Sequence, residues 1–191
     1  MADDLLIRVA GKGDVAAVAS LRLAWTPDTG GGRDRGAPGP TTGDPEPAGH
    51  PGPDTTGDHP EFERHLAASI AGEGERRTIW LAELAGVAVG MATLYEFRRM
   101  PRPGRIDSRW GYVGSMFVRE ECRNRGIGAA LLGALVDAAT DRAYVRLVVS
   151  PTARSVPLYR RAGFLDADGE AGELLFRARE PLSARQRRAC C

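Results

Sequence analysis

Lysine is almost absent from this chain of 191 residues: Lys12 is the only one, so arginine supplies nearly all of the 26 basic side chains. A P-loop nucleotide site needs a Gly-Lys pair followed by Ser or Thr, and no second lysine is present to complete one, which excludes that motif. Arginine in place of lysine, beside abundant Ala, Gly and Pro, suggests a GC-rich genome, and we expect a bacterial source.

Cysteine, long apolar runs and excess charge are also scarce. The three cysteines are an odd number, and Cys190 and Cys191 stand together at the end, so no disulfide framework is predicted. No apolar run is long enough to cross a membrane, and no signal peptide opens the chain. The net charge of +1 gives no basic excess for nucleic acid. We expect a cytoplasmic protein with no membrane or nucleic-acid partner.

One domain over residues 1–180 fits this length, with a segment of different composition inside it. Residues 27–60 hold 8 of the 13 prolines and 9 of the 24 glycines, with almost no large apolar side chain. Such a segment cannot bury enough surface to offset the entropy lost on ordering, so it is predicted to be a flexible insertion. A neutral linker and a lid over a substrate site both stay open. Residues 181–191 form a basic, solvated tail.

The stretch from Gly111 to Leu132 organises the rest of the chain. Tyr112 to Val118 is apolar and predicts a buried strand, and Arg119 to Arg125 is a polar loop. From Gly126 the apolar residues fall at helical spacing. A strand, a basic loop with glycines and a helix N-terminus form a phosphate site, because the first helical N–H groups lack partners and glycine permits close approach.

Apolar periodicity and turn residues predict the other elements. The expected strands are Leu5–Val9, Thr78–Leu84, Val87–Phe97, Tyr144–Val149 and Leu174–Ala178, and the expected helices follow Asp14, begin near Pro60 and span Ser155–Ala162. Ala85-Gly86 predicts a tight hairpin turn between two of the strands.

Two motifs resemble those of the GNAT family, the GCN5-related N-acetyltransferases. Arg123, Gly126 and Gly128 match the family's Gln/Arg-x-x-Gly-x-Gly/Ala signature, whereas a dinucleotide site would need Gly-x-Gly-x-x-Gly. Downstream, the segment Leu158 to Phe164 is similar to the family's Leu-Tyr-x-x-x-Gly-Phe. The resemblance implies an α/β (α+β) fold, with a mixed, mostly antiparallel sheet, a splayed parallel strand pair and about four flanking helices.

The resemblance also implies acetyl-CoA as co-substrate and no metal. The pantetheine arm would pair with backbone groups of Met116, Phe117 and Val118, where two strands separate. Thr152 stands where the family often has an asparagine that holds pantetheine, so Thr152 or Ser155 would substitute. The pyrophosphate would bind the loop and helix start, at Arg123, Asn124, Arg125, Gly126, Ile127, Gly128 and Ala129.

Acetyl transfer to an amine needs a base for the amine, a donor for the oxyanion and a proton for the departing thiolate. Tyr159 occupies the family position of the general acid. Glu96 at the end of a strand is the candidate base, with Asp107, Ser150 or a water as alternatives. His59 and His65 are not favoured, and Cys122 is expected to fill space because no histidine base is close to it in sequence.

The predicted function is transfer of acetyl from acetyl-CoA to a primary amine of a small molecule, by direct attack in a ternary complex. The alternatives are acetylation of a protein N-terminus or lysine, and a non-catalytic acyl-CoA-binding module. Acidic residues prevail in the insertion and arginines in the segment 98–105, so charge does not select an acceptor. A homodimer also stays open.

Overall fold

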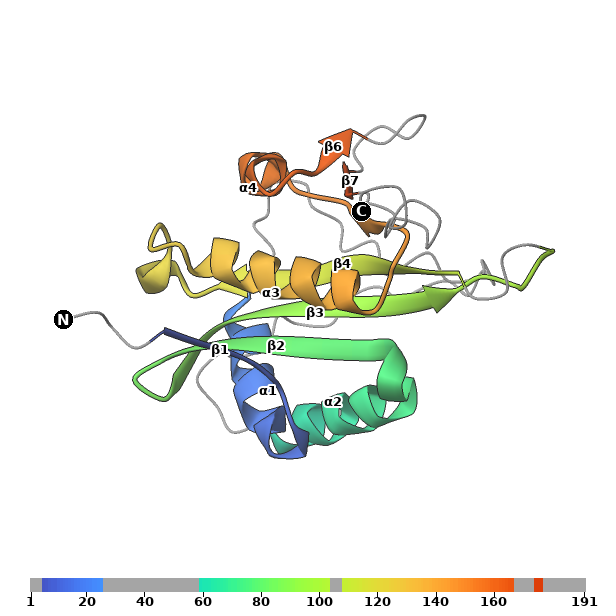
Figure 1. Cartoon of the computed structure of the whole chain (residues 1–191). Coiled ribbons are helices and arrows are strands. Elements are labelled where there is room, and N and C mark those ends of the chain that lie inside the picture. Colours follow the sequence, from blue (N-terminus) through green and yellow to red (C-terminus); the bar gives the residue numbers. More distant parts are fainter. Residues whose placement is uncertain (1–4, 26–58, 104–107, 167–173, 177–191) are drawn as a thin grey trace, which may run out of the picture.

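The computed structural model describes residues 5–25, 59–103, 108–166 and 174–176 (Figure 1). Most of the predicted insertion at 27–60 and the whole of the tail at 181–191 lie outside these ranges. Seven strands and four α-helices make up the described part of the chain. In order they are β1 (Leu5–Val9), α1 (Val15–Ala24), α2 (Pro60–Glu73), β2 (Arg77–Leu84), β3 (Val87–Arg98), β4 (Arg109–Val118), α3 (Ile127–Asp141), β5 (Leu147–Val149), α4 (Val156–Arg161), β6 (Leu165–Asp166) and β7 (Leu174–Phe176).

The strands form one sheet in the order β1-β2-β3-β4-β5-β7-β6. All pairings are antiparallel except that of β4 with β5, which is parallel. This parallel pair is short: only Gly111 with Leu147 and Tyr112 with Val148 are in register. Beyond Tyr112, β4 runs on to Val118 without β5 beside it. The mixed sheet with a splayed parallel pair confirms the predicted fold class.

Helices cover both faces of the sheet. Figure 1 shows α1 and α2 below β2 and α3 against β3 and β4, with α4 beside the C-terminal strands. The apolar side of α3 faces the larger core, where Leu131, Leu132 and Leu135 are fully buried. A second cluster lies under α1 and includes Leu21, Leu81 and Phe117. The helical periodicity read from the sequence is therefore confirmed for α3. No helix within the described ranges is long and apolar enough to cross a bilayer.

The start of two strands differs from the predictions by more than one residue. β4 begins at Arg109 rather than Tyr112, and β5 begins at Leu147 rather than Tyr144. Tyr144 instead belongs to the turn after α3, where Ala143 has a φ of 54° and the Tyr144 N–H bonds to the Ala139 carbonyl. The two-residue strand β6 was not predicted. The hairpin turn at Ala85-Gly86 is confirmed, since both residues have positive φ as such a turn requires.

Asp14 stands at the N-cap of α1, as predicted, but its side chain does not cap that helix. One carboxylate oxygen accepts the Gly11 N–H at 2.6 Å, and the other accepts Arg8 at 2.7 Å. These contacts lower the pKa of Asp14 to about 2, the bond from Arg8 being the main cause and that from Gly11 the next. Asp14 therefore ties the turn before α1 to the edge strand β1.

Candidate active site

The loop after β4 turns the chain into α3 through two left-handed residues. Asn124 has a φ of 62° and Gly126, the N-cap of α3, a φ of 81°. The first helical bond runs from the Ala130 N–H to the Gly126 carbonyl. The N–H groups of Ile127, Gly128 and Ala129 precede that bond, at the positive end of the helix dipole. The predicted phosphate-binding backbone thus lies at a helix start, as an anion site requires.

Arg123 in this loop is engaged with the end of β4. Its Nε donates to the Val118 carbonyl at 3.1 Å, and its Nη1 lies 3.8 Å from a carboxylate oxygen of Glu120. Arg125 is exposed. Of the two arginines predicted to contact phosphate, Arg123 therefore also fixes the loop to the strand. Its bond uses the Val118 carbonyl, which is one of the backbone groups predicted to bind pantetheine.

The segment Met116 to Val118 lies along the separated part of β4. On one side Phe117 pairs with Met91 and Val118 with Gly90 of β3. On the side toward β5, no described strand pairs with residues 113–118. One edge of this segment is therefore not paired by any described strand, and binding of pantetheine there stays a prediction.

A bulge in β4 directly before this segment was not predicted. The register with β3 shifts between Met91 and Thr93, opposite Ser115, which has a φ of 49°. The Ser115 hydroxyl accepts a bond of 3.0 Å from Arg22 of α1, and the Arg22 guanidinium lies 5.2 Å from the Trp25 ring centre. A left-handed residue other than glycine is strained, and such strain is common at functional sites.

Tyr159 of α4 is buried, with 3% of its surface exposed. Its ring meets Phe164 edge to face at a centroid distance of 5.5 Å. Burial raises the pKa of the Tyr159 hydroxyl well above its usual value, and the neighbouring Tyr112 raises it further. Tyr112 forms the last parallel pair with Val148, where β4 and β5 begin to separate. The structure thus brings Tyr159 to the mouth of the splayed strands.

Thr152 and Ser155 lie together at the start of α4. The Thr152 hydroxyl donates to the Ser155 hydroxyl at 3.2 Å, and the Ser155 hydroxyl donates to the Thr152 carbonyl at 3.0 Å. Neither bond caps α4, so Ser155 is the N-cap residue by position only. Pantetheine contact by either residue stays a prediction.

Glu96 is buried within the sheet and surrounded by hydrogen-bond donors. Oε2 accepts the Tyr144 hydroxyl at 2.7 Å, Oε1 accepts Arg98 Nε at 2.7 Å, and Arg109 Nη1 lies 3.8 Å away. Burial favours the protonated form, but the bonds from Tyr144 and Arg98 and the charge of Arg109 outweigh it and lower the pKa of Glu96. The carboxylate is therefore ionised and strongly held.

The remaining candidates are more distant from this arrangement or cannot be placed. Asp107 lies outside the described residues. Ser150 is exposed directly after β5, and His59 and His65 belong to the start and the exposed side of α2. Cys122 is buried in the larger core, in agreement with a space-filling role. Within the described ranges, no group of His, Cys, Asp or Glu could hold a metal ion.

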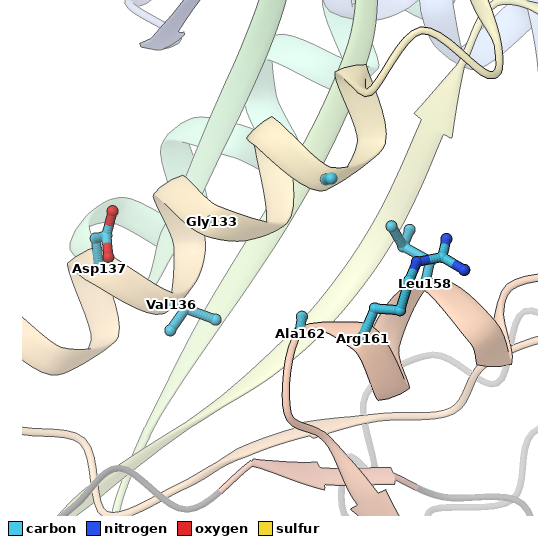
Figure 2. Close-up of a pocket in the computed structure, with 7 residues that line it drawn as sticks. Gly133, Val136, Asp137, Leu158, Arg161 and Ala162 are labelled. Carbon is cyan, nitrogen blue, oxygen red and sulfur yellow. The ribbon is translucent and has the colours of Figure 1, made fainter.

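A groove between α3 and α4 adds residues that the sequence reasoning missed. Its lining comprises Ala129, Gly133, Val136, Asp137, Leu158, Arg161 and Ala162 (Figure 2). Gly128 adjoins it, since a Cβ there would stand 3.5 Å from a Leu158 methyl carbon. The spacing of Gly133 and Asp137 along one helix face could have suggested them, but their partners on α4 come from the fold. The groove begins at the phosphate-binding backbone.

Comparison with known proteins gives one family. The model of the acetyltransferase (GNAT) family matches residues 46–164, which is more than half of the chain. No curated protein matches the chain. Many solved structures share its fold.

Three such structures illustrate the likeness. A predicted acetyltransferase from Clostridium acetobutylicum, crystallised with acetyl-CoA, has a TM-score of 0.57 and 19% identity over 87% of this chain and 93% of its own. A GCN5-related N-acetyltransferase from Ralstonia eutropha JMP134 has a TM-score of 0.58 and 20% identity, over 87% of this chain and 96% of its own. A ribosomal-protein-alanine N-acetyltransferase from Brucella melitensis biovar Abortus 2308 has a TM-score of 0.59 and 18% identity, over 87% of this chain and 95% of its own.

Proposed function

Because the chain belongs to the acetyltransferase (GNAT) family, we propose that it transfers acetyl from acetyl-CoA to a primary amine of a small molecule. The transfer proceeds by direct attack of the amine in a ternary complex. The observation that carries this proposal is the position of Tyr159 beside Tyr112, where β4 separates from β5. A buried proton donor, an unpaired strand edge and a helix N-terminus are thus close together.

The described residues fit acetyl-CoA at three points. The N–H groups at the start of α3 suit the pyrophosphate, because they are unpaired in the helix and lie at its positive end. The free edge of Met116 to Val118 suits the amide groups of pantetheine. The groove between α3 and α4 adjoins the first of these places at Ala129, and Arg161 in its lining adds a positive charge for phosphate oxygens.

Tyr159 would act on the departing sulfur. Its raised pKa keeps the hydroxyl protonated throughout the neutral range, so the hydroxyl can donate to the negative charge that develops on the thiolate. The edge-to-face contact with Phe164 restricts the ring, and burial excludes competing water. The family position and the local structure support the same role.

The base is a separate part of the proposal. Glu96 remains a candidate, but its oxygens already accept bonds from Tyr144 and Arg98, and its lowered pKa makes it a weak proton acceptor. We therefore favour proton removal through water over direct transfer to Glu96.

Turnover of a panel of primary amines with acetyl-CoA tests the function. Mass spectrometry of the products is preferable to a thiol reagent, because Cys122, Cys190 and Cys191 would also react with such a reagent. We expect at least one small amine to gain an acetyl group, at a rate that Tyr159→Phe lowers. Acetylation of peptide N-termini or lysines alone, with no small amine used, would contradict the small-molecule proposal.

A further inference from the structure

Two aromatic side chains and one guanidinium form a stack across β3, β4 and the start of β5. Phe97 and Trp110 are in register, and their rings are nearly parallel at a centroid distance of 4.4 Å. The guanidinium carbon of Arg146 lies over the Trp110 ring, 5.2 Å from its centre. The position of the Arg146 backbone is fixed as well, because its carbonyl accepts the Gly111 N–H at 3.0 Å.

The charge of Arg146 has no anionic partner within the described part of the chain. Its Nε is buried there and forms no hydrogen bond. A buried donor without an acceptor costs free energy, so such a group in a native structure needs an explanation. The Nε of Arg77 is also buried without a hydrogen bond, but Arg77 contacts a carboxylate through Nη2. Arg8 and Arg160 likewise contact carboxylates.

Burial alone does not explain why Arg146 remains unpaired, since a carboxylate is close in register. Glu96 is next to Phe97 on β3, so its side chain lies on the opposite face of the sheet from the Phe97 ring. There it contacts Arg98 and Arg109. The guanidinium of Arg146 is thus kept on the face of Trp110, away from Glu96. Stacking on an aromatic ring orients a guanidinium and leaves its edge for a planar anion.

This stack lies on the face of the sheet that carries Tyr112, next to the point where β4 and β5 separate. Trp110 and Tyr112 are two residues apart on β4, so their side chains share a face, and Tyr112 forms the last parallel pair before the strands separate. Arg146 precedes Val148, the register partner of Tyr112, by two residues, which is roughly 6.6 Å along a strand. Here β4 and β5 are paired, so a ligand must lie on the sheet face rather than between the strands.

From this arrangement we infer that Arg146 is a specificity-determining residue that binds a carboxylate of the acceptor. The inference rests on the proposed function and narrows it: the acceptor is a small primary amine that also carries a carboxylate. Its amine lies near Tyr159 and its carboxylate on Arg146, with Trp110 and Tyr112 between them. Bidentate contact between guanidinium and carboxylate is the strongest recognition available to such a group.

A series of ω-amino acids tests the inference, each paired with its own primary amide as neutral control. The probes are β-alanine, 4-aminobutanoate, 5-aminopentanoate and 6-aminohexanoate. For at least one length, we expect kcat/KM of the acid to exceed that of the amide by about tenfold or more, since charged hydrogen bonds contribute that much. Arg146→Gln should reduce this ratio to about twofold or less by raising KM for the acid, with kcat for the amide unchanged.

Two further variants separate recognition from stability. Arg146→Lys keeps the charge and should retain part of the preference, whereas a purely structural role would lower acid and amide turnover equally. Arg102→Gln removes an exposed arginine from the segment after β3 and should leave the preference intact.

Equal use of acid and amide by the wild type, or an unchanged preference in Arg146→Gln, would overturn the inference. So would turnover of acidic peptides with none of the small acids. Titration of acetyl-CoA into the same samples distinguishes a failure of this inference from a failure of the proposed function. Normal acetyl-CoA binding without turnover of any acid contradicts the inference alone, whereas failure to bind acetyl-CoA contradicts the proposed function itself.

Discussion

The Tyr144 hydroxyl donates a hydrogen bond of 2.7 Å to Oε2 of Glu96, and this bond joins the turn after α3 to the buried part of β3. Burial raises the pKa of Tyr144, and the bond to Glu96 raises it further, so the hydroxyl stays a donor at every pH at which the protein is expected to be folded. The charges of Arg98 and Arg109 complete the environment of the carboxylate.

Glu96→Gln should lower the free energy of unfolding at pH 7 by about 1.5–3 kcal/mol, because it removes a charged acceptor from buried donors. The folded-state pKa of Glu96 lies below its ordinary value of 4.5, so its contribution is fully present above pH 4.5 and is lost as pH falls further. Urea unfolding from pH 7 to pH 3 should therefore show the wild type and variant converging toward acid. A constant difference would contradict this account, and Glu121→Gln on the exposed loop serves as the control.

The same Glu96→Gln variant separates two roles for the carboxylate. If a water carries the amine proton away, the folded variant should retain most of its turnover. Loss of about a hundredfold in kcat from a folded variant, with its pH profile flattened on the acid side, would instead establish Glu96 as the base.

Tyr159→Phe should lower kcat by about a hundredfold or more and leave the Kd of acetyl-CoA nearly unchanged. The variant keeps the ring and its contact with Phe164, so only the proton donor is lost. Steady-state kinetics with an amine from the panel, together with calorimetry, measure the two quantities. Tyr95→Phe is the matched control, because Tyr95 lies opposite Tyr112 in the sheet and has no proposed part in proton transfer. A large loss of acetyl-CoA affinity in Tyr159→Phe would rule out the acid role.

Gly111→Ala should destabilise the fold by about 1–3 kcal/mol through overpacking. A Cβ at this position would stand 2.7 Å from methyl carbons of both Leu94 and Leu147 and 3.0 Å from the Tyr144 ring. Thermal unfolding measures the effect, and Gly72→Ala in α2, where a Cβ meets nothing within 4 Å, is the control. An unchanged melting temperature in Gly111→Ala would show that these side chains can move aside.

Local patterns in the sequence predict the elements that depend on local physics. The spacing of Leu131, Leu132 and Leu135 predicts α3 because helical periodicity brings these side chains to one face. Gly126 predicts the turn into that helix because a positive φ favours glycine. The family resemblance then supplied the mixed, mostly antiparallel sheet and its splayed parallel pair.

Features that depend on distant partners could not be predicted. The bulge at Ser115 places a serine at positive φ, and its hydroxyl is bonded by Arg22, 93 residues earlier in the chain. The environment of Glu96 depends on Tyr144, which the sequence assigned to a strand. The stack of Trp110 and Arg146 forms only when β4 and β5 meet. Each of these features joins segments whose approach is set by the whole sheet.

Calorimetric titration of acetyl-CoA into wild type, Gly126→Val and Gly86→Val tests the central claim most directly. Gly126 and Gly86 have φ values of 81° and 79°, and a Cβ at either meets nothing within 4 Å, so a side chain should cost each similar stability. We predict that wild type and Gly86→Val bind acetyl-CoA and that Gly126→Val, folded but altered at the start of α3, does not. Normal binding by Gly126→Val, or none by the wild type, would contradict the assignment of this loop as the acetyl-CoA site.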